Sequence, residues 1–88
     1  MTSQQREREA ELHARERLQA LIAAAVLRAL GRPDALRAVQ VRWLWDDHYR
    51  VNVLTGEDGP AAITHSYFLT ADGAGVILES SPAIVRTY

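Results

Sequence analysis

Residues 41–56 read VRWLWDDHYRVNVLTG and carry the pattern from which the rest of the architecture can be argued. On both sides of Asp46-Asp47-His48, apolar and polar residues alternate with the two-residue period of half-buried β-strands. The two aspartates interrupt this alternation with a residue type that favours turns. The stretch therefore predicts an antiparallel hairpin.

The register of this hairpin depends on the length of its turn. A two-residue turn, Asp46-Asp47, would place Trp43 opposite Arg50 and mix polar with apolar side chains on both faces. A three-residue turn that also includes His48 makes one face wholly apolar, so we predict that turn, with His48 in the left-handed conformation. The expected pairs are Trp45 with Tyr49, Trp43 with Val51 and Val41 with Val53, and both tryptophans should be buried beneath a helix.

Asp46, Asp47 and His48 could also suggest a metal or catalytic site. A metal ion would need a further ligand, such as His65 or Asp72, and consecutive residues at a turn tip rarely converge on one ion. The chain has no cysteine, which excludes disulfides and thiolate ligands. We therefore expect no metal site and no cofactor, and we interpret the three residues as structural.

Upstream of the hairpin, residues 3–30 are rich in alanine, leucine, arginine, glutamate and glutamine, which predicts one long helix. Thr2 and Gln5 have the spacing of a capping box at its start. Gly31, in a left-handed cap position, and Pro33 should end it. Residues 1–15 form a strongly charged helical extension.

The apolar residues of the predicted helix spread over nearly half its circumference, more than one sheet requires. Two explanations remain open: alanine is tolerated anywhere on a helix, or a second partner packs there. A helix of about 28 residues is also longer than the strands, so its charged start should overhang the sheet and be marginal alone. We predict a two-fold homodimer. The candidate interface consists of Leu12, Ala23, Leu27 and Leu30.

Downstream, residues 61–70 predict a third strand and Val76 begins a fourth, which Pro82 places at an edge of the sheet. The tail, residues 83–88, should either continue this strand past a kink or form a separate edge strand. We predict a single α+β domain over residues 1–88, in which one long N-terminal helix packs on an antiparallel sheet of three to four strands.

The sheet face away from the helix should carry a candidate binding face made of Gln40, Arg42, Arg50 and Asn52. It is either an ordinary solvated surface or a site for a partner. Single-stranded nucleic acid prefers exposed aromatic residues and positive charge, whereas this face offers Phe68 alone and the net charge is −1. We therefore expect a protein-interaction module, with nucleic-acid binding through this face as the alternative.

An enzymatic function finds little support in the sequence. His65 in ITHSYFLT should lie at the edge of the core, and Ser66 should point to the opposite face, so no nucleophile and base are brought together. We expect no catalytic residue and no enzyme.

The composition, 48% hydrophobic and 24% charged over 88 residues, is that of a folded protein. No secretion signal and no membrane-spanning run is apparent, so a cytoplasmic protein without membrane contact is expected. All ten basic residues are arginine, which suggests codon bias in a GC-rich genome or a selected role for arginine.

The stretch HYRVNVLTGEDG, followed by ITHSYFLTADGAGVIL, resembles the small PepSY domains and, more broadly, cystatin-like folds. Tyr49, Val51 and Val53 match the Tyr-x-Val-x-Val strand of that family, and Asp72 and Gly75 match its later turn. The resemblance covers roughly residues 18–80 and implies a binding or inhibitory module. The ending SSPAIVRTY is similar to the tails of small bacterial proteins for which no activity can be named.

Overall fold

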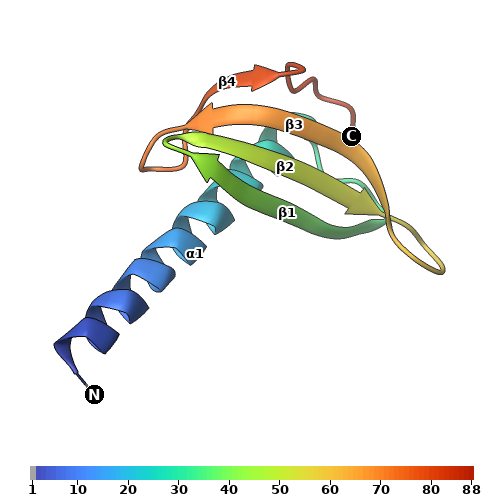
Figure 1. Cartoon of the computed structure of the whole chain (residues 1–88). Helices are drawn as coiled ribbons and strands as arrows, with labels where there is room; N and C mark the ends of the chain where they lie inside the picture. Colours follow the sequence, from blue (N-terminus) through green and yellow to red (C-terminus); the bar gives the residue numbers. More distant parts are fainter. Residues whose placement is uncertain (1) are drawn as a thin grey trace.

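A computed structural model describes residues 2–88 of the chain (Figure 1). Helix α1 (Ser3–Leu30) precedes four strands: β1 (Leu36–Trp45), β2 (His48–Thr55), β3 (Ala62–Ala71) and β4 (Ile77–Ser81). The strands pair antiparallel in the order β1-β2-β3-β4. The predicted α+β arrangement of one helix and an antiparallel sheet is confirmed.

The ends of α1 follow the predicted signals. The Gln5 N–H donates to Thr2 Oγ1 at 3.2 Å, and the Thr2 N–H donates to Gln5 Oε1 at 2.8 Å, which completes the capping box. At the other end the Gly31 N–H donates to the Leu27 carbonyl at 2.8 Å. Gly31 has the expected positive φ of 88°, but its ψ of 158° is extended rather than left-handed helical.

A narrow stripe of α1 faces the sheet. Ile22, Val26 and Leu30, spaced four residues apart, are buried, and Leu18 packs against the same core. They meet side chains from the inner faces of the strands, the ones turned toward the helix. These strand residues are Tyr49, Val51, Val53, Tyr67, Leu69 and Ala71. The core is therefore one layer thick, between a single helix and one face of a sheet.

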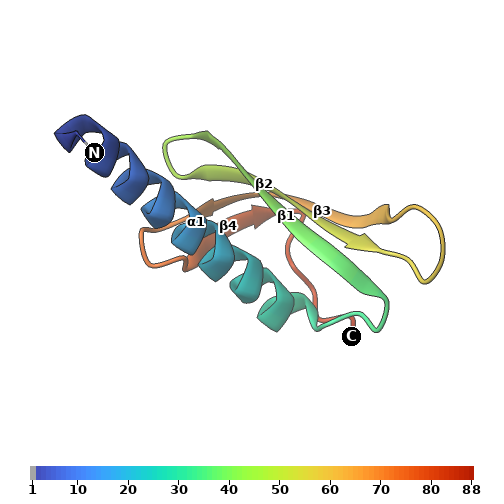
Figure 2. The same ribbon diagram turned by 90° about the horizontal axis from the view of Figure 1, so that it is seen from below.

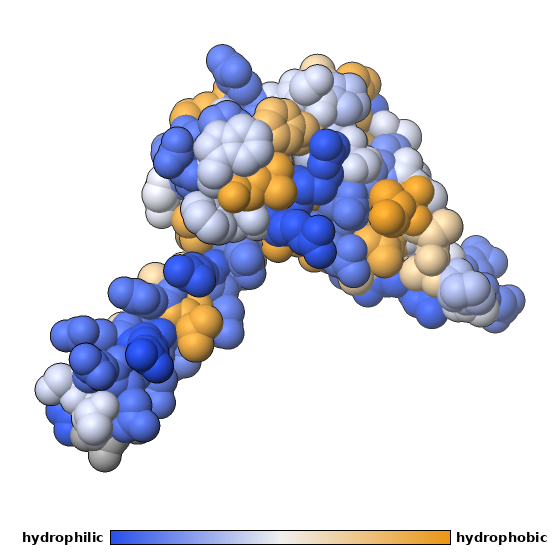
Figure 3. All heavy atoms as spheres, in the orientation of Figure 1, coloured by the Kyte–Doolittle hydropathy of each residue, from blue (hydrophilic) through white to orange (hydrophobic). Residues whose placement is uncertain are grey.

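The first half of α1 projects beyond the sheet. All residues from Thr2 to Arg17 are exposed, and we call residues 3–17 the overhang. Figures 1 and 2 show it leaving the sheet at the end where the β1–β2 and β3–β4 turns lie. Its surface is mostly hydrophilic (Figure 3). The charged extension predicted over residues 1–15 is helical from Ser3 and exposed, and Met1 lies outside the described residues.

The predicted register of the β1–β2 hairpin is wrong. The turn has two residues, Asp46 and Asp47, and β2 begins at His48, which pairs with Trp45. Leu44 has no partner and forms a β-bulge, so that Trp43 lies opposite Tyr49. The bulge restores an apolar inner face without a third turn residue. The residue with positive φ is Asp46, at 46°, and not His48.

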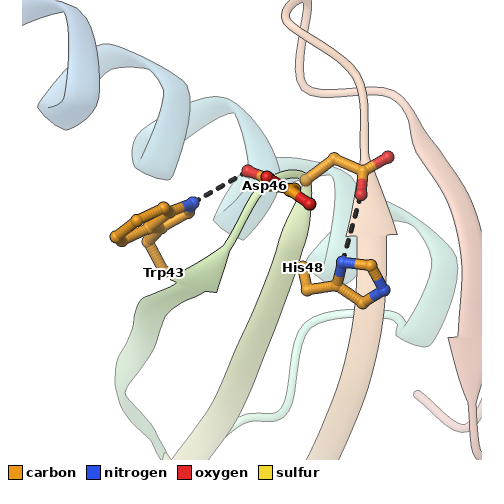
Figure 4. Close-up of polar contacts among 4 residues, drawn as sticks. Trp43, Asp46 and His48 are labelled. Atoms are coloured by element: carbon orange, nitrogen blue, oxygen red, sulfur yellow. Dashed lines mark hydrogen bonds and ion pairs between the residues drawn. The ribbon is translucent and has the colours of Figure 1, made fainter.

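Because of this bulge, the two tryptophans are not buried as we predicted. Because it shifts the alternation by one residue, Trp45 points to the outer face of the sheet while Trp43 stays on the inner face. Trp43 lies at the margin of the core and donates its Nε1–H to the Asp46 carbonyl at 2.8 Å (Figure 4). The two side chains are 54% and 50% exposed, so neither is a core residue.

The tail forms neither the continued strand nor the separate edge strand that we predicted. Beyond Ser81 it is irregular and returns to the C-terminal end of α1. The N–H groups of Thr87 and Tyr88 donate to the Leu30 carbonyl at 2.7 and 3.1 Å, and Arg86 Nη1 donates to the Arg28 carbonyl at 3.4 Å. These bonds satisfy carbonyls that a helix end leaves without partners.

Candidate binding surface

The outer face of the sheet, opposite α1, is not covered by any other element of residues 2–88 (Figure 2). The register places Gln40 opposite Asn52 and Arg42 opposite Arg50 on this face. The structure therefore brings together the four residues proposed from the sequence. They line, with Val41, a surface hollow of about 340 Å³.

The hollow is dominated by hydrogen-bond donors. Within residues 2–88, neither Arg42 nor Arg50 forms an ion pair with a carboxylate. Arg50 Nη1 reaches Ser66 Oγ at 3.5 Å, and its guanidinium lies 5.7 Å from the centre of the Phe68 ring. The Ser66 hydroxyl donates to Asn52 Oδ1 at 2.6 Å, which leaves the amide N–H groups of Asn52 as donors. Such a set can bind an anion.

Next to the hollow lies an aromatic cluster that sequence reasoning missed. Trp45 stacks on His48, with ring centres 4.5 Å apart and planes inclined by 17°. Phe68 lies 5.8 Å from Trp45 and 5.5 Å from His48. The run Trp43-Leu44-Trp45, three apolar residues in succession, was the available signal, because it breaks strict alternation and is what a bulge would produce.

The cluster is bordered by acidic residues. His48 Nδ1 is 3.2 Å from Asp47 Oδ1 (Figure 4). That separation suits an ion pair, but the atoms are not aligned for a hydrogen bond, so we regard the contact as weak. Glu79 lines a second hollow beside His48 and Phe68, of about 190 Å³. No group of three or more His, Cys, Asp or Glu residues placed to hold a metal ion occurs in residues 2–88.

The titratable groups of the inner face are engaged in packing. Burial raises the pKa of the Tyr49 phenol, and the charge of Asp47 adds to this effect. Burial likewise raises the pKa of Tyr67, with a smaller contribution from Tyr88. His65 Nε2 lies 3.0 Å from the Tyr88 hydroxyl, and its ring stacks on Tyr67. His65 is thus bonded to the side chain of a tail residue.

The four candidate interface residues on α1 differ in exposure. Leu12, in the overhang, is 52% exposed, and Ala23 and Leu27 are half-buried. Leu30 is 1% exposed within the core of its own chain, so its side chain is not available to a second chain. The remaining three lie on one flank of the helix, because positions 12, 23 and 27 fall within about 60° of each other at 100° per residue.

Comparison with known proteins finds no matching family model, and no match among curated sequences or solved structures. The resemblance to PepSY domains therefore stays a prediction. Among the residues described, no helix is long and apolar enough to cross a membrane.

Proposed function

We propose that the chain is a non-enzymatic protein-interaction module that acts as a homodimer, with α1 contributing to the interface. The observation that carries this proposal is the overhang, which is helical from Ser3 although every residue from Thr2 to Arg17 is exposed. A helical segment of this length is marginal in water on its own. A second chain would supply the packing that the overhang lacks.

The flank formed by Leu12, Ala23 and Leu27 offers a surface for that chain. Close to it is a mostly apolar hollow of about 160 Å³, which is lined by Arg15, Leu18, Gln19, Trp43 and Tyr49. Trp43 is half-exposed there, as is Leu12 further along the helix. Docking of a second α1 on this flank would remove both apolar side chains from water, which is the usual driving force of association. Two identical flanks meeting across a two-fold axis form a closed dimer.

The proposal that the module is not an enzyme rests on how His48 and His65, the two histidines of the sheet, are held. His48 stacks on Trp45, and His65 contacts Tyr67 and Tyr88. Neither has a serine or threonine hydroxyl as a hydrogen-bond partner within residues 2–88, which is what nucleophilic catalysis would require. Binding therefore accounts for these residues more simply than catalysis.

The alternative, binding of nucleic acid, would be favoured by a continuous basic surface that joins Arg42 and Arg50 to the other arginines. Arg86 is instead held at the end of α1 by its bond to the Arg28 carbonyl. The helix arginines of the overhang alternate with glutamates. We therefore retain protein interaction as the proposed function.

Light scattering of the purified chain tests the dimer. At tens of micromolar we expect about twice the 9.8 kDa chain mass. Leu27→Glu should restore the mass of one chain without loss of helical circular dichroism, because it places a charge in the interface. Ala24→Glu is the matched control, since Ala24 is exposed on the side of α1 away from the core. A wild-type chain of single mass at every concentration would refute the dimer.

A further inference from the structure

We propose that the outer face of the sheet binds a carboxylate-bearing segment of a partner protein, with Arg42 and Arg50 together holding the carboxylate. This goes beyond the dimer, which uses the opposite side of the domain. The occupant is identified by its chemistry: an acidic side chain flanked by apolar ones.

The charges of the hollow have no carboxylate partner among residues 2–88. Arg42 and Arg50 are direct cross-strand neighbours, and like charges in this position repel each other. No carboxylate within residues 2–88 forms an ion pair with either one. A carboxylate placed between them would accept hydrogen bonds from both guanidiniums and from the Asn52 amide, and charge-assisted bonds of this kind are strong and directional. One bound group would thus remove the repulsion and satisfy the donors.

Apolar side chains flank the arginines along the sheet. On one side lie Trp45 and Phe68 of the aromatic cluster. On the other, Leu54 pairs with Ile63, which is 57% exposed. The face therefore presents an apolar patch, then the two arginines, then a second apolar patch. This order is complementary to a protein segment in which an acidic residue lies between hydrophobic ones.

The acidic residues that border the site disfavour binding of a polyanion. Asp46, Asp47 and Glu79 lie beside the aromatic cluster, which is the part of the face where bases would have to stack. A nucleic-acid strand carries a phosphate at every nucleotide and would bring some of them near these carboxylates. A protein segment can carry its acid opposite the arginines and none opposite the acidic border.

Binding can be measured by two-dimensional NMR of the labelled chain with three probes. The first is a short peptide with one glutamate between leucines, the second is the same peptide with glutamine in place of glutamate, and the third is oligothymidylate. We expect the glutamate peptide to shift the amide signals of Arg42, Arg50 and Asn52. The glutamine peptide should bind at least about tenfold more weakly, the loss expected for one charge-assisted interaction.

The double variant Arg42→Gln/Arg50→Gln should lose this binding, whereas Arg6→Gln/Arg8→Gln, which removes two charges from the overhang, should keep it. Equal binding of both peptides, binding that survives in the first variant, or tighter binding of oligothymidylate would overturn the proposal. The titration is repeated with Leu27→Glu. If that variant still binds the peptide, the site functions whether or not the chain forms a dimer, so the two proposals can fail independently.

Discussion

Arg42 lies directly opposite Arg50 on the neighbouring strand, and neither guanidinium comes within 4.0 Å of a carboxylate oxygen in residues 2–88. Both side chains are exposed on the face of the sheet that α1 leaves open. Two like charges in this position oppose strand pairing. The free chain therefore carries an electrostatic cost that a bound anion would relieve.

The first prediction follows from this pair. Arg42→Gln should raise the free energy of unfolding of the free chain by about 0.2–1 kcal/mol, because it removes the repulsion across β1 and β2. Thermal denaturation at low salt would measure the gain, and added salt should reduce it. Arg37→Gln is the control and should bring no gain, since Arg37 donates to the carbonyls of Gly56 and Gly59. A loss of stability in Arg42→Gln would mean that the pair is not repulsive.

The second prediction concerns Trp43. Because its side chain is half-exposed at the margin of the core, Trp43→Ala should cost about 1–2 kcal/mol, which is ordinary for a single substitution. Leu69→Ala, at a fully buried position, should cost about 2–5 kcal/mol. Urea denaturation of both variants would compare them. If Trp43→Ala were the more damaging, Trp43 would have to belong to the core.

The third prediction concerns the turn between β1 and β2. Asp46 has a φ of 46°, a region that residues with a branched Cβ avoid. Asp46→Gly should be neutral or slightly stabilising, whereas Asp46→Val should cost about 1–2 kcal/mol. Asp47→Val serves as the control, because Asp47 lacks a positive φ. Equal effects of the two valine substitutions would contradict the two-residue turn.

The same geometry removes His48 from the left-handed turn position that the sequence predicted. With His48 in β2 and stacked on Trp45, His48→Gly should destabilise the hairpin, since it removes the stack and introduces glycine into a strand. Thermal denaturation would show a lowered melting temperature, and His48→Phe, which keeps a ring, should recover most of it. An unchanged melting temperature in His48→Gly would support the three-residue turn instead.

A further prediction concerns alkaline pH. Burial raises the pKa of Tyr49 and Tyr67 in the folded chain, so the folded state holds these protons more tightly than the unfolded state. The contribution of these two tyrosines to the free energy of unfolding is fully present below the unfolded tyrosine pKa of about 10. It is lost as pH rises through the higher pKa values of the folded state. Tyr49→Phe/Tyr67→Phe should therefore lose less stability above that pH than the wild type. Parallel declines of the two proteins would rule this out.

The helix could be predicted because its determinants are local. Thr2 and Gln5 form the capping box expected from their spacing, and Gly31 ends the helix where its backbone freedom is needed. Gly31 also tolerates no side chain, since a Cβ there would lie 2.2 Å from the Tyr88 carbonyl oxygen. That second reason depends on the tail and could not be inferred from a distance of 57 residues along the chain.

The hairpin shows where pattern reasoning stops. Val41, Val51 and Val53 were assigned to the correct face, because alternation fixes the face of each residue. The partner of each residue was not fixed, since one bulge at Leu44 satisfies the alternation as well as a longer turn does. Trp45 was consequently placed in the core, and the aromatic cluster beside the arginines was missed.

The candidate sites were predicted to different extents. Gln40, Arg42, Arg50 and Asn52 come together as proposed, because their shared face follows from alternation and survives the change of register. Leu30 was misassigned to a dimer interface because periodicity alone cannot tell which flank of a broad apolar arc faces the sheet. Leu30 is buried because the strands and the tail enclose it, and these elements are distant in the sequence.

The measurement that tests the homodimer most directly is hydrogen exchange of the overhang amides as the protein is diluted. If a second chain stabilises residues 3–17, these amides should be protected at tens of micromolar and should exchange faster as the dimer dissociates, while the amides of β2 and β3 stay protected. In Leu27→Glu the overhang should exchange fast at every concentration. Overhang exchange that is independent of concentration in the wild type, together with a mass of 9.8 kDa, would contradict the proposed dimer.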